Sequence, residues 1–154
     1  MSDDDDDGFH VRTIEELHQI RDQALIESAK ELEKYDLPSM CIDDMMALFE
    51  HACMEQYDTY VDDDLKKYNI NYNIMIAVND ELKARGVQAR LSLLRFFDHP
   101  NLQVRVKAAT LTYRVAPEAA RRCLDDIAKA GFPDQSLAAG MTLRAIDNGT
   151  SMLT

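Results

Sequence analysis

The chain has 154 residues and a mass of 17.5 kDa, which is enough for one domain with its own core. Apolar residues make up 46% and charged residues 29%, so the composition excludes a chain that is disordered throughout. No apolar run reaches the length of a membrane span, and the first residues are acidic rather than basic like a secretory signal. We therefore expect a cytoplasmic protein with no membrane partner.

The net charge of −11 is divided unevenly along the chain. Residues 1–64 carry 20 acidic and 4 basic side chains, whereas residues 65–154 carry 8 acidic and 13 basic ones. An acidic half repels a phosphate backbone and attracts a cationic protein. The charge pattern argues against nucleic acid as a partner and favours a protein with a basic surface, although a solvated face is the simpler interpretation of any single carboxylate.

The N-terminal part predicts an acidic tail followed by a helix. We expect a flexible tail over residues 1–12, which includes the run Asp3 to Asp7, and a single helical domain over residues 13–154. Thr13 and Glu16 have the spacing of a capping box, which starts the first helix. Its predicted apolar face consists of Ile14, Leu17, Ala24, Leu25, Ala29 and Leu32.

Two further helices follow, over about 39–57 and 65–85. The first is amphipathic, with an acidic outer surface. The triplet from Asp62 to Asp64 suits the positive N-terminus of the second. That second helix is apolar on two sides, so we expect it to lie between neighbours, and Gly86 ends it.

The second half predicts shorter helices with clear breaks and no strand. They cover about 88–97, 102–115, 117–131 and 135–147, so the predicted class is all-α, with about seven helices in the whole chain. A turn containing His99 and Pro100 separates the first two, and Asn101 is placed to cap the next helix. In this turn we expect His99 to make a local hydrogen bond or to face solvent.

Residues 91–116 resemble one HEAT-type repeat, in Leu93, Leu94, Phe96 and Phe97, the Asp98–Asn101 turn, Val104 and the pair Ala108–Ala109. A longer stretch, about 65–149, resembles the bacterial family called domain of unknown function 2019. It matches in Lys67–Asn69, Glu81–Gly86, His99–Asn101, Gln103–Arg105, Lys107–Ala109, Ala116–Arg121, Gly140–Met141 and Leu143–Ala145. The resemblance implies a HEAT-like stack of antiparallel helix pairs. It implies no particular activity, because none is assigned to the family. Related α-repeat families occur beside bacterial toxins as immunity proteins.

The residue patterns of known catalytic and cofactor sites are missing from the sequence. The four histidines and three cysteines show no spacing of a metal site, and there is no glycine-rich phosphate loop. Cys53 and Cys123 fall on apolar helix faces, where core packing is the default. We expect no enzyme activity, no cofactor and no bound metal.

The leading hypothesis is a non-enzymatic immunity protein that covers the active site of a cognate toxin with a basic surface. Two tyrosines would anchor the contact among the carboxylates. The candidate partner-binding residues are Asp43, Asp44, Glu50, Glu55, Tyr57, Asp58, Tyr60, Asp62, Asp63 and Asp64.

Two alternatives remain open. A HEAT-like scaffold or adaptor would bind a cellular protein or a second copy of the chain, and we expect a monomer or weak homodimer when no partner is bound. A HEAT-like enzyme that excises damaged DNA bases is disfavoured by the net charge and by the absence of Trp.

Overall fold

The computed structural model describes residues 11–150, and within them the chain is all-α, as predicted. Residues 1–10 of the predicted tail lie outside the described range. The elements are α1 (Ile14–Leu32), η1 (Leu37–Ser39), α2 (Ile42–Asp62), α3 (Leu65–Arg85), α4 (Val87–Arg90), η2 (Leu91–Phe96), α5 (Leu102–Thr112), α6 (Pro117–Lys129) and α7 (Pro133–Asp147), where η denotes a 3₁₀ helix.

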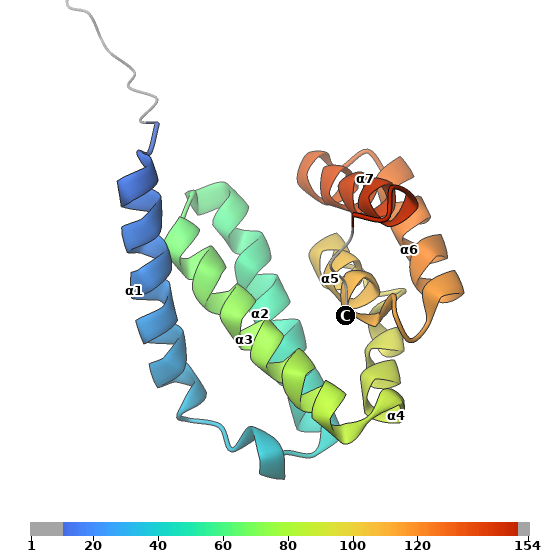
Figure 1. Ribbon diagram of the computed structural model, residues 1–154, viewed down its shortest axis with the longest axis horizontal. Coiled ribbons are helices and arrows are strands. Elements are labelled where there is room, and N and C mark those ends of the chain that lie inside the picture. The colour runs from blue at the N-terminus through green and yellow to red at the C-terminus, as the bar shows by residue number, and fades with distance from the viewer. Residues whose placement is uncertain (1–10, 151–154) are drawn as a thin grey trace, which may run out of the picture.

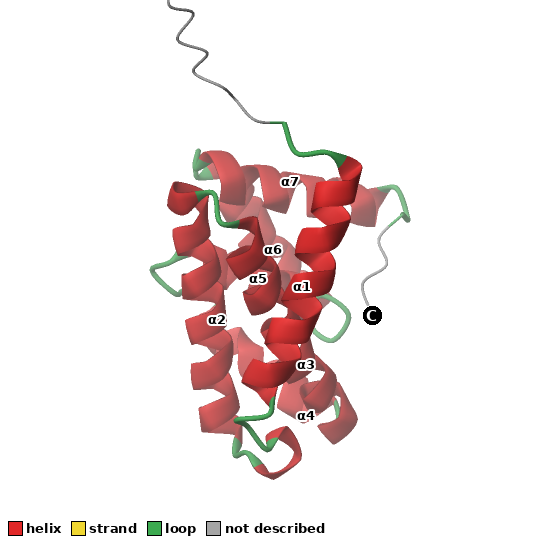
Figure 2. Cartoon of the chain, turned by 90° about the vertical axis from the view of Figure 1, so that its left-hand side faces the viewer, coloured by secondary structure: helices red, strands yellow, loops and turns green. Residues whose placement is uncertain are grey.

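The helices form two groups, and α2 of the first group packs against α5 of the second (Figure 1). In the first group α3 packs against both α1 and α2, and in the second α6 packs against α5 and α7. Figure 2 shows α1 in front of the other helices and α2 to its side. The predicted central position of the helix over 65–85 is confirmed, because both of its neighbours bury part of it.

The core consists of two apolar clusters that share α5. Met45, Phe49 and Leu82 belong to the larger cluster, between α2, α3 and η2. Leu124 and Ile127 belong to the smaller one, between α5, α6 and α7. Burial of each such side chain contributes about 1.5–3 kcal/mol. The helix α5 is buried on both sides, which fixes one group of helices against the other.

Three buried glutamines also join the two groups, and we call them the glutamine bridge: Gln56 of α2, Gln103 of α5 and Gln135 of α7. The Gln103 Nε2 donates to the Gln56 Oε1 at 2.6 Å, and the Gln135 Nε2 donates to the Gln103 Oε1 at 3.2 Å. All three side chains are almost fully buried. Their amides therefore satisfy each other where no water can reach.

The helix ends follow the local sequence signals. The Thr13 Oγ1 accepts from the Glu16 amide while the Glu16 carboxylate accepts from the Thr13 amide, so the capping box is present. Asn101 caps α5 through its side-chain oxygen. Gly86 ends α3 at φ +107°, a backbone conformation that residues with a Cβ rarely adopt.

Helix α1 differs from the prediction in the face that it buries. Only Ala24 and Ser28 are buried, whereas Ile14 and Leu25 of the predicted stripe are 73% and 52% exposed. The reason is that α1 packs chiefly against one neighbour, α3. Two small side chains let the helices approach closely, and the larger apolar residues remain at the edge of the contact.

Two helix boundaries also differ from the prediction. Helix α2 continues to Asp62, beyond the expected end at Tyr57, and stops where Asp63 adopts φ +50°. The expected helix over 88–97 is one α-turn followed by η2. A 3₁₀ helix has three residues per turn, so Arg90, Leu93 and Phe96 line up, and these three are the buried residues of the segment.

Candidate functional site

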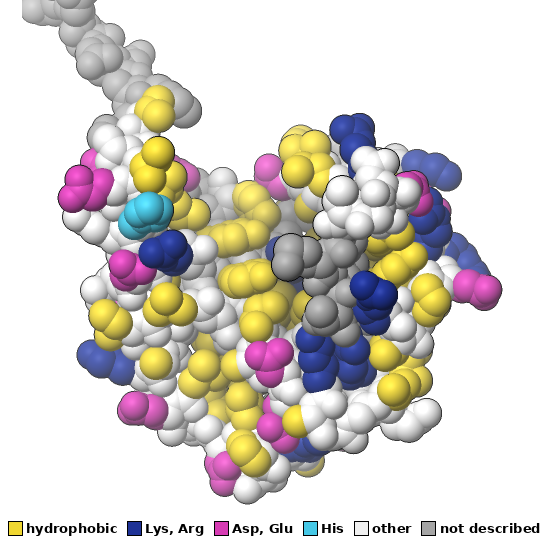
Figure 3. All heavy atoms as spheres, viewed as in Figure 1, with side chains coloured by type: hydrophobic (Ala, Val, Ile, Leu, Met, Phe, Trp, Pro, Cys, Tyr) yellow, Lys and Arg dark blue, Asp and Glu magenta, His cyan; other side chains and the backbone are white. Residues whose placement is uncertain are grey.

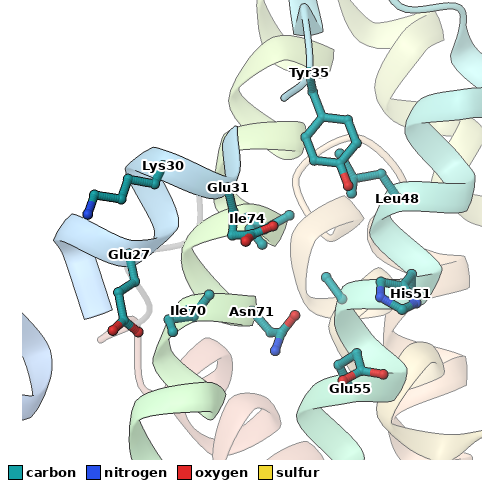
Figure 4. Close-up of a pocket in the computed structure, with 11 residues that line it drawn as sticks. Glu27, Lys30, Glu31, Tyr35, Leu48, His51, Glu55, Ile70, Asn71 and Ile74 are labelled. Atoms are coloured by element: carbon teal, nitrogen blue, oxygen red, sulfur yellow. The ribbon is translucent and has the colours of Figure 1, made fainter. Parts of the chain in front are cut away.

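A groove runs between α1 and α2, and α3 forms its floor. Both walls pack chiefly against α3, and a cavity of about 360 Å³ remains between them. Ile70, Asn71 and Ile74 form the floor. Figure 4 shows Glu31 and Asn71 pointing into this space, while Lys30 extends away from it.

The carboxylates in this narrow part of the groove are paired with lysines. Glu27 lies 3.2 Å from Lys66, and Glu55 lies 3.0 Å from Lys67. A hydrogen bond from Gln23 and the pairing with Lys66 lower the pKa of Glu27. The Glu55 carboxylate raises the pKa of Lys67. These charges are compensated within the molecule, so the narrow part attracts a further cation only weakly.

The groove widens beside the start of α2 into a cavity of about 500 Å³. Tyr35, Leu48 and His51 line both parts, which makes the groove continuous. Two further carboxylates, those of Asp36 and Asp44, line the wide end. Among residues 11–150 neither has an ion pair or a side-chain hydrogen bond, so the wide end carries uncompensated negative charge.

The outer face of α2 contains most of the predicted contact residues. Helix α2 has no Lys or Arg. Asp44, Asp58 and Asp62 are exposed, and their carboxylates make no ion pair with any residue that the structure describes. The face also includes the apolar side chains of Met54 and Val61. The structure thus brings free carboxylates and apolar side chains together on one helix.

Two predicted carboxylates lie at the edge of α2 that faces the second half of the chain. Asp43 pairs with Arg95 at 3.0 Å, although the Asp43 side chain is still 84% exposed. Glu50 accepts from the Nε2 of His99 at 3.3 Å. The backbone amide of Asn101 donates to the Nδ1 of the same ring at 2.9 Å, so in the neutral ring the proton lies on Nε2. The predicted local hydrogen bond of His99 is confirmed.

The predicted residues at the α2–α3 corner contribute to the fold. Asp63 pairs with Arg12 at 3.1 Å, and Asp64 caps α3 by accepting from the Lys67 amide at 3.0 Å. The ring of Tyr60 packs edge-on against that of Tyr68, at 6.0 Å between centroids. Burial raises the pKa of the Tyr60 hydroxyl. Their structural contacts leave these residues less available to a partner than the outer face.

The charge asymmetry along the chain is also an asymmetry in space. In Figure 3 the Lys and Arg side chains gather on the right-hand side, over the second half of the chain. Acidic α2 belongs to the opposite group of helices (Figure 1). Opposite ends of the molecule therefore carry opposite charge, and a basic partner approaches the α2 end.

The sequence analysis did not find the α1 wall of the groove. Glu27, Glu31 and Tyr35 line it, as does His51 from α2. The spacing of Glu27 and Glu31, one turn apart and next to the small residues Ala24 and Ser28, is the available signal. The expected apolar stripe shares Ala24 with the observed packing face, but its larger members Ile14 and Leu25 are exposed, so the stripe drew attention away from the groove wall.

Within residues 11–150 no three His, Cys, Asp or Glu side chains come together in a way that could hold a metal ion. Nor does any helix in that range combine the length and apolarity that crossing a bilayer requires.

Comparison with known proteins identifies a family. The model of domain of unknown function 2019 matches residues 43–147, so it includes α2 and begins earlier than the resemblance from about 65. The crystal structure of the protein RPA1889 from Rhodopseudomonas palustris superimposes with a TM-score of 0.74 at 38% sequence identity, over 78% of this chain and 99% of that one. No curated protein matches. The chain belongs to the family of domain of unknown function 2019.

Proposed function

We propose that the protein is a non-enzymatic binding module that holds a basic protein partner on the outer face of α2. The observation that carries the proposal is the set of unpaired carboxylates there, on Asp44, Asp58 and Asp62. Because the helix has no cation of its own, the field of these carboxylates extends into solvent. Such a field steers a basic surface toward the helix and accelerates association.

Apolar side chains on the same face provide the contacts that would hold the partner. Met54, Tyr57 and Val61 are spaced i, i+3 and i+7, and they are 41%, 38% and 85% exposed. Residues at this spacing lie along one side of a helix. Interfaces usually depend on a few apolar or aromatic anchors within a charged rim. Of the two tyrosines predicted as anchors, Tyr57 has the better position, because Tyr60 packs against Tyr68.

The specific form of the proposal is an immunity protein that acts in the cytoplasm. A toxin that acts on nucleic acid or nucleotides needs a basic cleft for phosphate, and a helix with carboxylates along one face imitates that charge. A HEAT-like interpretation of the fold agrees with this role. The pair α6–α7 stacks beside α5, and stacks of helix pairs are rigid surfaces for protein partners.

A capture experiment with matched variants tests the binding surface. The test variant is Asp44→Asn, Asp58→Asn and Asp62→Asn, which breaks no ion pair among the described residues. The control is Asp98→Asn, Glu118→Gln and Asp126→Asn, which removes the same charge from exposed positions in the second half. We expect wild type and control to retain one basic protein from native lysate, and the test variant to lose it.

Two further measurements make the test decisive. Association of the purified pair should slow as salt rises, because screening weakens the steering. Production of the protein encoded directly upstream should arrest growth, and co-production of this chain should restore it. Equal capture by the test and control variants would refute the α2 surface. A harmless upstream product would refute the immunity role while leaving the binding role intact.

Helix α1 favours a second candidate function, self-association or an adaptor role. Ile14 and Leu25 are exposed on a helix that buries only two residues, and Ile26 is 54% exposed. A second helix packed along α1 would cover these exposed apolar side chains. Sedimentation equilibrium decides between the two functions. A stable dimer that Leu25→Glu abolishes would favour the second, and a monomer at all concentrations would exclude self-association.

A further inference from the structure

We propose that the wide end of the α1–α2 groove binds an arginine side chain of the basic protein partner. This inference rests on the proposed function, because it names the partner residue that the acidic end of the molecule recognises. Helix α2 contributes Asp44 both to its outer face and to the groove, so the two surfaces are continuous. A partner that covers α2 therefore reaches the groove without a gap in the contact.

The charge of the wide end is the first argument. Asp36 and Asp44 both line the cavity, one from the connection after α1 and one from α2. Lys34 also lines it, but this lysine pairs with Glu31 at 2.8 Å. Within the described residues these two carboxylates have no cationic partner, and a guanidinium offers five N–H donors in a planar fork to carboxylates around it.

The lining of the cavity is the second argument. Tyr35 is 37% exposed and lines both parts of the groove. Met40 and Leu48 add apolar surface at the wide end. An arginine stem packs well on apolar groups, and its flat head stacks on an aromatic ring, whereas a lysine head is compact and strongly hydrated. The combination of ring, apolar wall and two carboxylates selects arginine over lysine.

The position of Asp44 has a competing structural explanation, which the test separates from binding. Asp44 lies in the first turn of α2, where a carboxylate stabilises the helix dipole. That role does not involve Asp36, which lies at the start of η1 and makes no side-chain cap. Asp36 also has no packing role, since it is exposed. Two carboxylates with different local roles therefore line the same cavity.

The experiment is an NMR titration of the full chain with N-acetyl-arginine amide. We expect amide shifts centred on Tyr35, Ala47 and His51, which line the wide end. N-acetyl-citrulline amide has nearly the same shape without the charge, so it should give no saturable shift. N-acetyl-lysine amide should bind about two- to fivefold more weakly, because it gains less from the Tyr35 ring.

Two variants locate the site. Asp36→Asn with Asp44→Asn should weaken arginine binding by at least about threefold, because two ion pairs are lost. Tyr35→Leu should remove the preference for arginine over lysine. Asp98→Asn with Asp126→Asn removes the same charge from exposed positions in the second half of the chain and should leave the titration unchanged. Circular dichroism melts confirm that each variant is folded, since Asn at position 44 also weakens the start of α2.

The outcomes distinguish this inference from the proposed function. Equal shifts with arginine and citrulline amides, or shifts that do not centre on the groove, would overturn the arginine site. In that case the outer face of α2 would still be supported if poly-L-arginine binds the wild type but not the variant Asp58→Asn with Asp62→Asn. If the arginine amide binds the groove while capture of a basic protein is independent of α2, the groove is real and the proposed function is wrong.

Discussion

Replacement of Gln103 by Met should destabilise the protein strongly although the new side chain is apolar and of similar volume. Gln103 is the middle residue of the glutamine bridge and is 1% exposed. The change removes the bonds of 2.6 Å to Gln56 and 3.2 Å from Gln135. The Gln56 Oε1 and the Gln135 Nε2 then lose their hydrogen bonds to Gln103 in a buried interface.

The magnitude follows from the number of groups left unpaired. Each buried polar group that loses its partner costs about 1–3 kcal/mol, so Gln103→Met should lower the free energy of unfolding by about 2–6 kcal/mol. Gln135→Met removes one bond and should cost roughly half as much. A domain of this size is stable by about 5–15 kcal/mol, so the first loss is a large fraction of the total.

Urea unfolding followed by circular dichroism measures these losses. Gln19→Met is the matched control, because Gln19 is exposed on α1 and its side chain has no hydrogen-bond partner among residues 11–150, and it should change stability by less than about 0.5 kcal/mol. If Gln103→Met behaves like the control, the bridge contributes nothing and the reasoning fails. Equal losses for the variants at 103 and 135 would show that the two bonds do not act separately.

Three further predictions concern other parts of the molecule. In the native protein Ellman's reagent should modify Cys41, which is exposed. Cys53 and Cys123 should react only on unfolding, because burial raises the pKa of both thiols. Equal reaction rates for all three cysteines would contradict this prediction. Absorbance at 295 nm should show Tyr60 ionising at higher pH than the other tyrosines, because burial raises its pKa. The free energy of unfolding should fall above about pH 10, because Tyr60 ionises in the unfolded chain before it does so in the folded one. If Tyr60→Phe leaves the absorbance titration unchanged, the assignment is wrong. Gly86→Ala should lower the free energy of unfolding by about 1–3 kcal/mol, because a φ of +107° is open mainly to glycine. Gly140→Ala in α7 should raise it by about 0.5–1 kcal/mol. Melting temperatures equal to that of the wild type would contradict both predictions.

The sequence predicted the elements whose signals are local. The Thr13 cap, the Asn101 cap and the end of α3 at Gly86 depend on residues within one turn of each other, and all three are present. The central position of α3 could be predicted as well, because its apolar residues lie on two sides. Cys53 and Cys123 are buried, as their apolar surroundings indicated.

Features that depend on distant partners could not be predicted. The packing face of α1 depends on the contact that Ala24 and Ser28 make with α3, and the larger apolar residues of α1 form a more conspicuous pattern on another face. The pairing of Asp43 with Arg95 joins residues 52 positions apart and removes one candidate carboxylate from the free set. The contact between Glu50 and His99 likewise joins residues 49 positions apart and removes a second candidate carboxylate from the free set. Which carboxylates are free is therefore a property of the fold.

Helix α1 contributes none of the buried residues of either apolar cluster, although it packs on α3. Both apolar clusters are centred on α2–α7, and the family match begins at Asp43, after α1 has ended. The α1 wall of the groove therefore lies outside both clusters, so a substitution on this wall leaves their packing intact. Substitutions at Glu27, Glu31 or Tyr35 would alter which ligands the groove binds and would change the free energy of unfolding little. A relative with the same interior and another first helix would discriminate among ligands differently.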